Sequence, residues 1–197
     1  LWLGCISNSP KFNQIQMEFT KIKALVALLI FPLLVGCGTN KVVAPKPEIK
    51  INIPSNCQTA KALTTVETEI SGAQFIDTKW QPAPDTELFD FLNNGGIACS
   101  YGLQGAEIGA TLRWVDDSKN NYEKWSQEWL KQGYERVDLS KFGLESGYFL
   151  VKPQSVNQEF HIWNLNFKSG GVWVSISRTS GDDLEAGKKL IEAVLAQ

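Results

Sequence analysis

Four cysteines and one histidine are the side chains best suited to covalent or metal chemistry in this chain of 197 residues. A cysteine thiolate is a nucleophile and a metal ligand, and a histidine can act as a general base. Cys37 directly follows an apolar run, whereas Cys57 and Cys99 lie in the more polar sequence behind it. Cys37 therefore needs a different explanation from the other two.

The residues before Cys37 have the layout of a secretory signal. Met17 precedes two lysines, an apolar run of 12 residues at 24–35, and then Gly36. The run contains a proline and is too short for a membrane-crossing helix, which needs about 20 residues. We interpret residues 1–16 as upstream, non-native sequence; a genuine N-terminal extension is the alternative.

The tetrad Leu-Val-Gly-Cys at 34–37 resembles the lipobox of bacterial lipoproteins. In that motif a small residue admits the peptidase, and the cysteine thiolate accepts the lipid. The resemblance implies that residues 17–36 are a signal peptide. It also implies that Cys37 begins a mature protein anchored by acyl chains such as palmitate to the extracytoplasmic side of the cell membrane. A buried cysteine in a core helix is the alternative.

Composition predicts a tether followed by one domain. Residues 37–53 contain prolines and lysines and few large side chains, which is typical of an extended, semi-rigid tether. Residues 54–197 suit a single globular domain with one core. The chain carries 19 Lys+Arg against 21 Asp+Glu. Because phosphate backbones are bound by clustered lysine and arginine, we expect no nucleic acid partner.

Cys57 and Cys99 remain once Cys5 and Cys37 are set aside. An exported protein meets an oxidising environment, where two cysteines more often form a disulfide than a metal site. Two cysteines without a histidine partner also make a poor zinc site, because zinc prefers four ligands. We predict a Cys57–Cys99 disulfide, no metal and no cofactor.

Hydrophobic periodicity predicts an α+β fold. Apolar residues recur at helical spacing in four segments, which are 56–72, 86–94, 119–133 and 180–197. A period of two, or a short extended pattern, marks seven more segments, which are 74–80, 97–103, 107–115, 134–139, 147–153, 159–167 and 171–178. We expect a mostly antiparallel sheet with helices packed on one side.

Motifs of the common enzyme classes are absent from the sequence, including the nucleophile elbow, the phosphate loop and the dinucleotide glycine pattern. His161 lies in a strand pattern, where a lone histidine is more often a cross-strand polar residue than a general base. The acidic pairs 116–117 and 182–183 could bind calcium, but both precede helices and are explained by capping. We therefore expect a protein that is not an enzyme.

Six tryptophans in the domain are candidates for ligand contact, because the indole ring stacks and donates a hydrogen bond. Trp125 and Trp129 fall on one helical stripe and are predicted to seat their helix on the sheet. Trp163 and Trp173, on neighbouring strands, are better candidates for a surface that binds a ligand or partner. Their exposure depends on strand register, since a slip of one residue reverses every side chain.

Three stretches carry a resemblance to a known group of proteins. They are the helix that Cys57 opens, which reaches Glu67, "GGIACSYG" at 95–102 and "FGLESGYF" at 142–149. The chain resembles small exported lipoproteins of actinobacteria whose function is unknown. It is more distantly similar to the extracellular sensor domains of mycobacterial serine/threonine kinases. The resemblance implies a lipid-anchored envelope domain with a Cys57–Cys99 bridge, an antiparallel sheet and no established enzyme activity.

The expected function is binding or interaction at the extracytoplasmic side of the cell membrane. The membrane is one partner, through a lipid on Cys37, and an unidentified envelope protein, glycan or lipid is the other. The alternative is an envelope enzyme, such as a cell-wall hydrolase, with an irregular site. Convergent carboxylates in a cleft would favour the enzyme, and an open apolar sheet face would favour binding.

Overall fold

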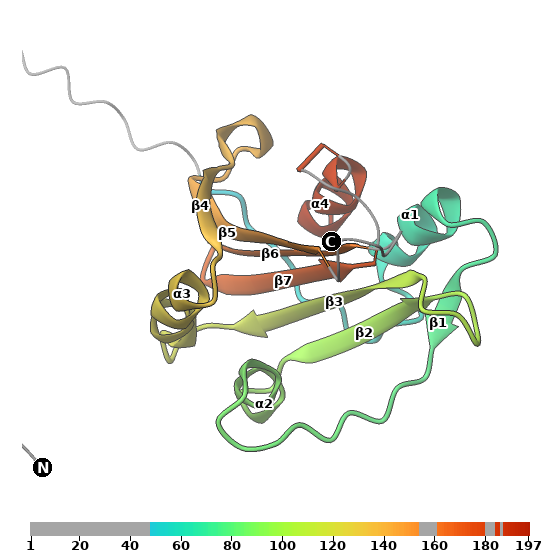
Figure 1. Ribbon diagram of the computed structural model, residues 1–197, viewed down its shortest axis with the longest axis horizontal. Helices are drawn as coiled ribbons and strands as arrows, with labels where there is room; N and C mark the ends of the chain where they lie inside the picture. The colour runs from blue at the N-terminus through green and yellow to red at the C-terminus, as the bar shows by residue number, and fades with distance from the viewer. Residues whose placement is uncertain (1–47, 154–160, 180–183, 186) are drawn as a thin grey trace, which may run out of the picture. The chain divides into compact units, whose positions relative to one another are not determined.

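The computed structural model describes residues 48–153, 161–179, 184–185 and 187–197. The predicted signal peptide at 17–36, Cys37 and the acidic pair 182–183 lie outside these ranges. Within them, seven strands form one antiparallel sheet in the order β1-β2-β3-β7-β6-β5-β4, and four α-helices pack against it (Figure 1). The predicted α+β class and antiparallel sheet are confirmed. The described residues include no helix that is both long enough and apolar enough to cross a membrane.

Each predicted element corresponds to one in the structure, usually with shorter bounds. The helices are α1 (Lys61–Glu69), α2 (Glu87–Asn93), α3 (Asn121–Lys131) and α4 (Lys188–Leu195), with a short 3-10 helix η1 (Ser140–Phe142). The strands are β1 (Gln74–Ile76), β2 (Ile97–Gly102), β3 (Gly109–Asp116), β4 (Glu135–Asp138), β5 (Ser146–Pro153), β6 (His161–Ser169) and β7 (Val172–Arg178).

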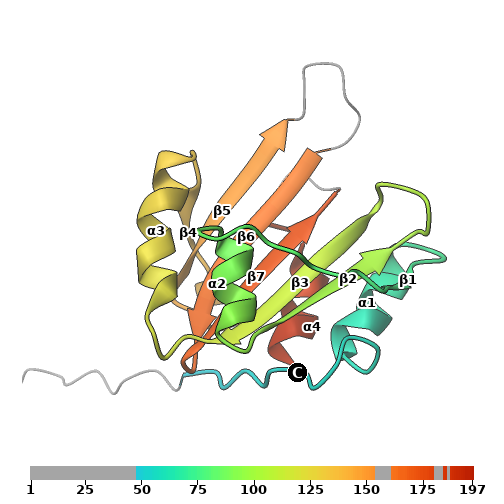
Figure 2. The same ribbon diagram turned by 90° about the horizontal axis from the view of Figure 1, so that it is seen from below.

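The helices cover both faces of the sheet, so the expectation that they pack on one side is wrong. Figure 2 shows α2 and α3 in front of the strands, with α1 and α4 behind. The central strand β7 explains this, because Val174 and Ile176 contribute to one core and Trp173 to the other. A strand that is apolar on both sides needs cover on both sides. We call these the α1/α4 core and the α2/α3 core.

The α1/α4 core is mainly aliphatic and contains Trp163. The Trp163 side chain is fully buried, so the expectation that it lies on a binding surface is wrong. Gly187, just before α4, explains how the helix reaches this ring, because a Cβ at that position would lie only 2.4 Å from the indole. Trp163 is therefore packed beneath the start of α4.

The α2/α3 core is mainly aromatic and contains Trp173. This side chain is also fully buried, and the expectation of a surface role is wrong here too. Its ring lies 3.9 Å from Phe91 of α2 and 5.5 Å from Trp129 of α3, between ring centroids. Its Nε1 donates to Asn166 Oδ1 at 3.2 Å. The prediction that Trp129 seats α3 on the sheet is confirmed by this packing.

The last six residues of the expected tether, 48–53, pack against the domain. The Ile51 side chain is buried in the α1/α4 core. Ser169 Oγ donates to the Ile49 carbonyl at 2.7 Å, and the Gly170 amide donates to Glu48 Oε1 at 2.7 Å. The boundary predicted at residue 54 is therefore too late, because Ile51 belongs to the α1/α4 core and Ile49 packs against that core.

Candidate functional site

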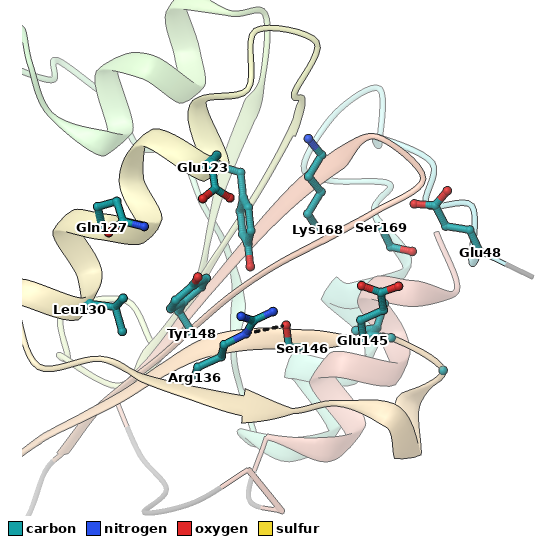
Figure 3. A pocket seen from close by; sticks show the side chains of 13 residues that line it. Glu48, Glu123, Gln127, Leu130, Arg136, Glu145, Ser146, Tyr148, Lys168 and Ser169 are labelled. Atoms are coloured by element: carbon teal, nitrogen blue, oxygen red, sulfur yellow. Dashed lines mark hydrogen bonds between the residues drawn. The ribbon is translucent and has the colours of Figure 1, made fainter. Parts of the chain in front are cut away.

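A cavity of about 570 Å³ opens at one end of the α2/α3 face. Its walls come from α3, the edge strand β4, its neighbour β5 with the segment before it, and the end of β6, as Figure 3 shows. Glu48, at the start of the described chain, contributes to the rim. The cavity thus joins segments that are far apart in the sequence, and the order of the strands at this edge of the sheet brings them together.

Arg136 of β4 supplies the cation at the centre of the site. Its register partner on β5 is Tyr148, so the guanidinium and the phenol lie on the same face of the sheet. Arg136 Nε donates to Ser146 Oγ at 3.2 Å, the contact drawn as a dashed line in Figure 3. Among the described residues, no carboxylate lies within ion-pairing distance of this guanidinium. Its two terminal nitrogens therefore keep their donors for another acceptor.

Two phenol groups lie beside Arg136. Tyr148 is only 8 % exposed, yet its hydroxyl has no hydrogen-bond partner within the described part of the chain. Its ring centroid is 5.9 Å from that of Tyr122, which comes from α3. Burial raises the pKa of Tyr122, and the neighbouring Tyr148 raises it further, against the opposing charge of Arg136. Tyr122 therefore stays protonated and can donate a hydrogen bond.

The second cation on the wall, Lys168, is already paired. Its Nζ lies 2.7 Å from Asp117 Oδ2, and the Asp117 side chain is almost completely buried. Asp117 Oδ1 also accepts the amide of Tyr122 at 3.1 Å, in the first turn of α3. The N-cap of α3 is Asn120 and not the pair 116–117, so the predicted capping position is wrong, although Asp117 does accept an amide of the first turn. A buried carboxylate with two such partners fixes α3 against the β6–β7 hairpin.

Three glutamates face the cavity. Glu123 extends from α3 and Glu145 from the segment before β5, and Figure 3 shows their carboxylates on opposite sides of the space. Neither carboxylate has a hydrogen bond or ion pair with another described residue. Glu48 is different, because one of its oxygens accepts the Gly170 amide. The site therefore combines one available guanidinium with two available carboxylates.

A hydrogen-bonded clasp between α2 and α3 holds the helical wall in place. Trp129 Nε1 donates to Glu87 Oε2 at 2.7 Å, and Trp125 Nε1 donates to Asp90 Oδ2 at 2.8 Å. Glu87 is also paired with Arg113 of β3 at 3.0 Å. Because each indole donates to a carboxylate on the other helix, a shift of α3 would leave a half-buried charge without its partner.

The cavity has a suitable size and suitable polar groups to bind a small molecule. The volume falls in the range of ordinary small-molecule sites, about 300–1,000 Å³. A guanidinium, two phenols and a serine hydroxyl can all donate to an anionic group, and Glu123 and Glu145 can accept from a cationic one. Among the described residues, no group of three His, Cys, Asp or Glu side chains is placed to hold a metal ion.

The residues singled out from the sequence fall at different places. Cys57 and Cys99 form the predicted disulfide, with their Cα atoms 5.3 Å apart. It joins the segment before α1 to β2, away from the cavity. Trp173 supports the cavity indirectly, through a ring contact of 6.1 Å with Tyr122, whereas Trp163 lies in the opposite core. His161 begins β6, opposite Pro153 in register, and its side chain is outside the described set.

Sequence reasoning missed the residues that form the cavity, with Arg136 and Tyr148 the clearest cases. Both lie in segments predicted as strands, "YERVDL" and "GYFLVKP". Arg136 alternates with Val137, which packs on the α1/α4 core, so an apolar neighbour does mark its face. That signal places the arginine opposite the α1/α4 core, but it does not identify Tyr148 as the neighbour across the strands.

Comparison of the chain with protein-family models, with curated proteins and with solved structures finds no match in any of the three.

Proposed function

We propose that the protein is a binding domain of the cell envelope, held at the extracytoplasmic face of the membrane by a lipid on Cys37, and that its ligand occupies the cavity beside Arg136. One observation supports the binding role above the others. A guanidinium without a carboxylate partner and the hydroxyl of the largely buried Tyr148, which has no hydrogen-bond partner among the described residues, face the same hollow. Both groups are open to solvent there, so their donors are available to a ligand.

The predicted lipid anchor would hold the cavity close to the membrane. Glu48 borders the cavity, and Cys37 lies eleven residues before it in the chain. A fully extended chain covers at most about 3.6 Å per residue, so a lipid on Cys37 would keep the cavity within about 40 Å of the bilayer. The proposed ligand is thus one that is found close to the membrane surface.

The anchor itself is tested by Cys37→Ala. Loss of the thiol should leave an unprocessed precursor that carries no lipid, because the thiolate is the acceptor. Mass spectrometry of the membrane fraction measures this directly. An unmodified Cys37 in a mature, membrane-bound chain would contradict the proposal.

The binding role is tested by isolating the full chain from its own membrane under mild detergent and identifying small molecules released on denaturation. Wild type and Lys131→Ala should retain the same molecule, and Arg136→Ala should lose it. Lys131 is the matched control, because it is an exposed cation that pairs only with Glu128 among the described residues and does not border the cavity. Equal retention by all three proteins would place the ligand elsewhere.

The enzyme alternative has one observation in its favour, which is that Glu123 and Glu145 face the same cavity. A pair of carboxylates on either side of a glycosidic bond is the usual apparatus of its hydrolysis. In that case Glu123→Gln or Glu145→Gln would abolish release of soluble cell-wall fragments while leaving the bound molecule in place. Under the binding proposal, no variant changes the rate at which such fragments appear.

A further inference from the structure

The charges around the cavity narrow the class of ligand. The available groups are the guanidinium of Arg136 and the carboxylates of Glu123 and Glu145, since Lys168 is neutralised by Asp117. One cation therefore faces three anions within the same hollow, because Glu48 keeps its charge while it accepts the Gly170 amide. A dianion such as a phosphate monoester would gain the guanidinium but would also be repelled by these carboxylates.

A carboxylate fits the Arg136 side of the site better. Because Nε already donates to Ser146, the terminal nitrogens of the guanidinium are oriented by that bond. They offer parallel N–H groups to a planar acceptor with two oxygens. The Tyr148 hydroxyl, on a side chain only 8 % exposed, adds a donor whose direction is set by the packing of its ring on Trp129 at 5.3 Å.

An ammonium group fits the opposite side. Glu123 and Glu145 accept hydrogen bonds and carry charges that no described cation neutralises. A ligand with a single negative group would leave both of them uncompensated. A ligand that carries both charges would satisfy the two sides of the cavity together.

We infer that the cavity binds a zwitterion of the amino acid and short peptide class, an inference that rests on the proposed binding function. The carboxylate of the ligand would lie on Arg136, Tyr148 and Ser146. Its ammonium group would lie between Glu123 and Glu145. Recognition of both termini limits the length of the peptide, because both must lie inside one space of about 570 Å³.

The test uses triglycine as the probe, because it presents both termini without side-chain preferences. Its affinity for the full chain in mild detergent is measured by isothermal titration calorimetry at low salt, beside N-acetyl-triglycine and triglycine amide. Each capped peptide should bind at least tenfold more weakly than triglycine. Arg136→Gln should remove the discrimination against the amide, and Glu123→Gln/Glu145→Gln should remove the discrimination against the acetylated peptide. Lys131→Gln, the matched surface control, should change neither.

Three results would overturn the inference. They are an amide that binds as tightly as triglycine, inorganic phosphate that displaces triglycine at lower concentration than glycine does, and no binding of triglycine at all. The last result is separable from failure of the binding function. If wild type still releases a molecule that Arg136→Ala lacks, the cavity binds a ligand and only the zwitterion class is wrong.

Discussion

The two cores of this domain contain different types of side chain and are stabilised by different interactions. On the α1/α4 side the core is mainly aliphatic, and the chain is tied by the Cys57–Cys99 disulfide. On the α2/α3 side seven aromatic side chains of the described residues gather, and indole groups donate to the carboxylates of Glu87 and Asp90. The cavity that Tyr122 and Tyr148 line lies mainly on the second side, although Leu144 of the α1/α4 core also contributes to its wall.

The contrast indicates a division of roles. Aliphatic packing and a disulfide stabilise a fold without demanding a particular orientation of polar groups. Aromatic rings with hydrogen-bonded polar ends fix both position and direction, which a binding site requires. We therefore expect damage to the α1/α4 core to lower stability alone, and damage to the α2/α3 core to lower both stability and binding.

The largest effects are expected from the two buried tryptophans. Trp163→Ala and Trp173→Ala should each lower the free energy of unfolding by about 3–5 kcal/mol, since each leaves a large cavity in a core. At temperatures where the variants are folded, Trp163→Ala should keep wild-type affinity for triglycine. Trp173→Ala should bind triglycine more weakly, because it removes the ring that packs against Tyr122. Urea unfolding and calorimetry measure the two quantities. Ile53→Ala, an exposed control, should change neither. Equal loss of affinity in both tryptophan variants would refute the division.

The disulfide should matter almost as much for stability and not at all for binding. Its cysteines are 42 residues apart, so the chain-entropy model assigns it about 4 kcal/mol, and measured values are commonly 2–4. Cys57→Ala/Cys99→Ala should lower the urea midpoint accordingly. Triglycine affinity should stay within twofold, because Cys99 faces the α1/α4 core. A tenfold loss of affinity would show that the two cores are coupled.

Local patterns predicted part of this molecule. The disulfide was predicted from the expectation of export and by elimination. The β2–β3 hairpin was predicted from alternation, and Cys99 and Leu112 are indeed register partners on one face. The sequence patterns predicted both strands, but they did not predict which face of the sheet Trp163 and Trp173 occupy. The two-residue turn pairs Ser169 with Val172 and thereby puts the two rings on opposite sides of the sheet. A three-residue turn over the same sequence, which would pair Ser169 with Trp173, would have put the two rings on the same side.

The cavity was beyond prediction for a related reason. It depends on β4 and β5 lying beside β6, on α3 crossing that edge and on residue 48 returning to the β6–β7 turn. The contact of residue 48 with Gly170 joins segments 122 residues apart, and periodicity carries no information about that contact or about where α3 lies on the sheet. The aromatic stripe of α3 was visible in the sequence, but its role as the wall of a cavity was not.

The smallest predicted effect is also the most specific to the α2/α3 core, and it concerns pH. Burial would raise the pKa of Asp90, but hydrogen bonds from Lys124 and Trp125 outweigh burial and hold the pKa below its ordinary value of 3.8. A carboxyl whose pKa is depressed on folding stabilises the protein above its unfolded pKa. That stabilisation is lost as the pH falls through the folded value.

Asp90→Asn should therefore lower the free energy of unfolding by about 1 kcal/mol at pH 7, the usual worth of a hydrogen bond to a charged group less the part an amide keeps. The deficit should shrink as the pH falls below 4 and vanish once the wild-type carboxyl is protonated. Urea denaturation at a series of pH values measures this. Asp85→Asn is the matched control, because Asp85 is exposed and has a left-handed backbone that asparagine also adopts. A deficit for Asp90→Asn that is the same at pH 2 and pH 7 would mean that Asp90 acts through packing, and that the indole–carboxylate clasp does not depend on charge.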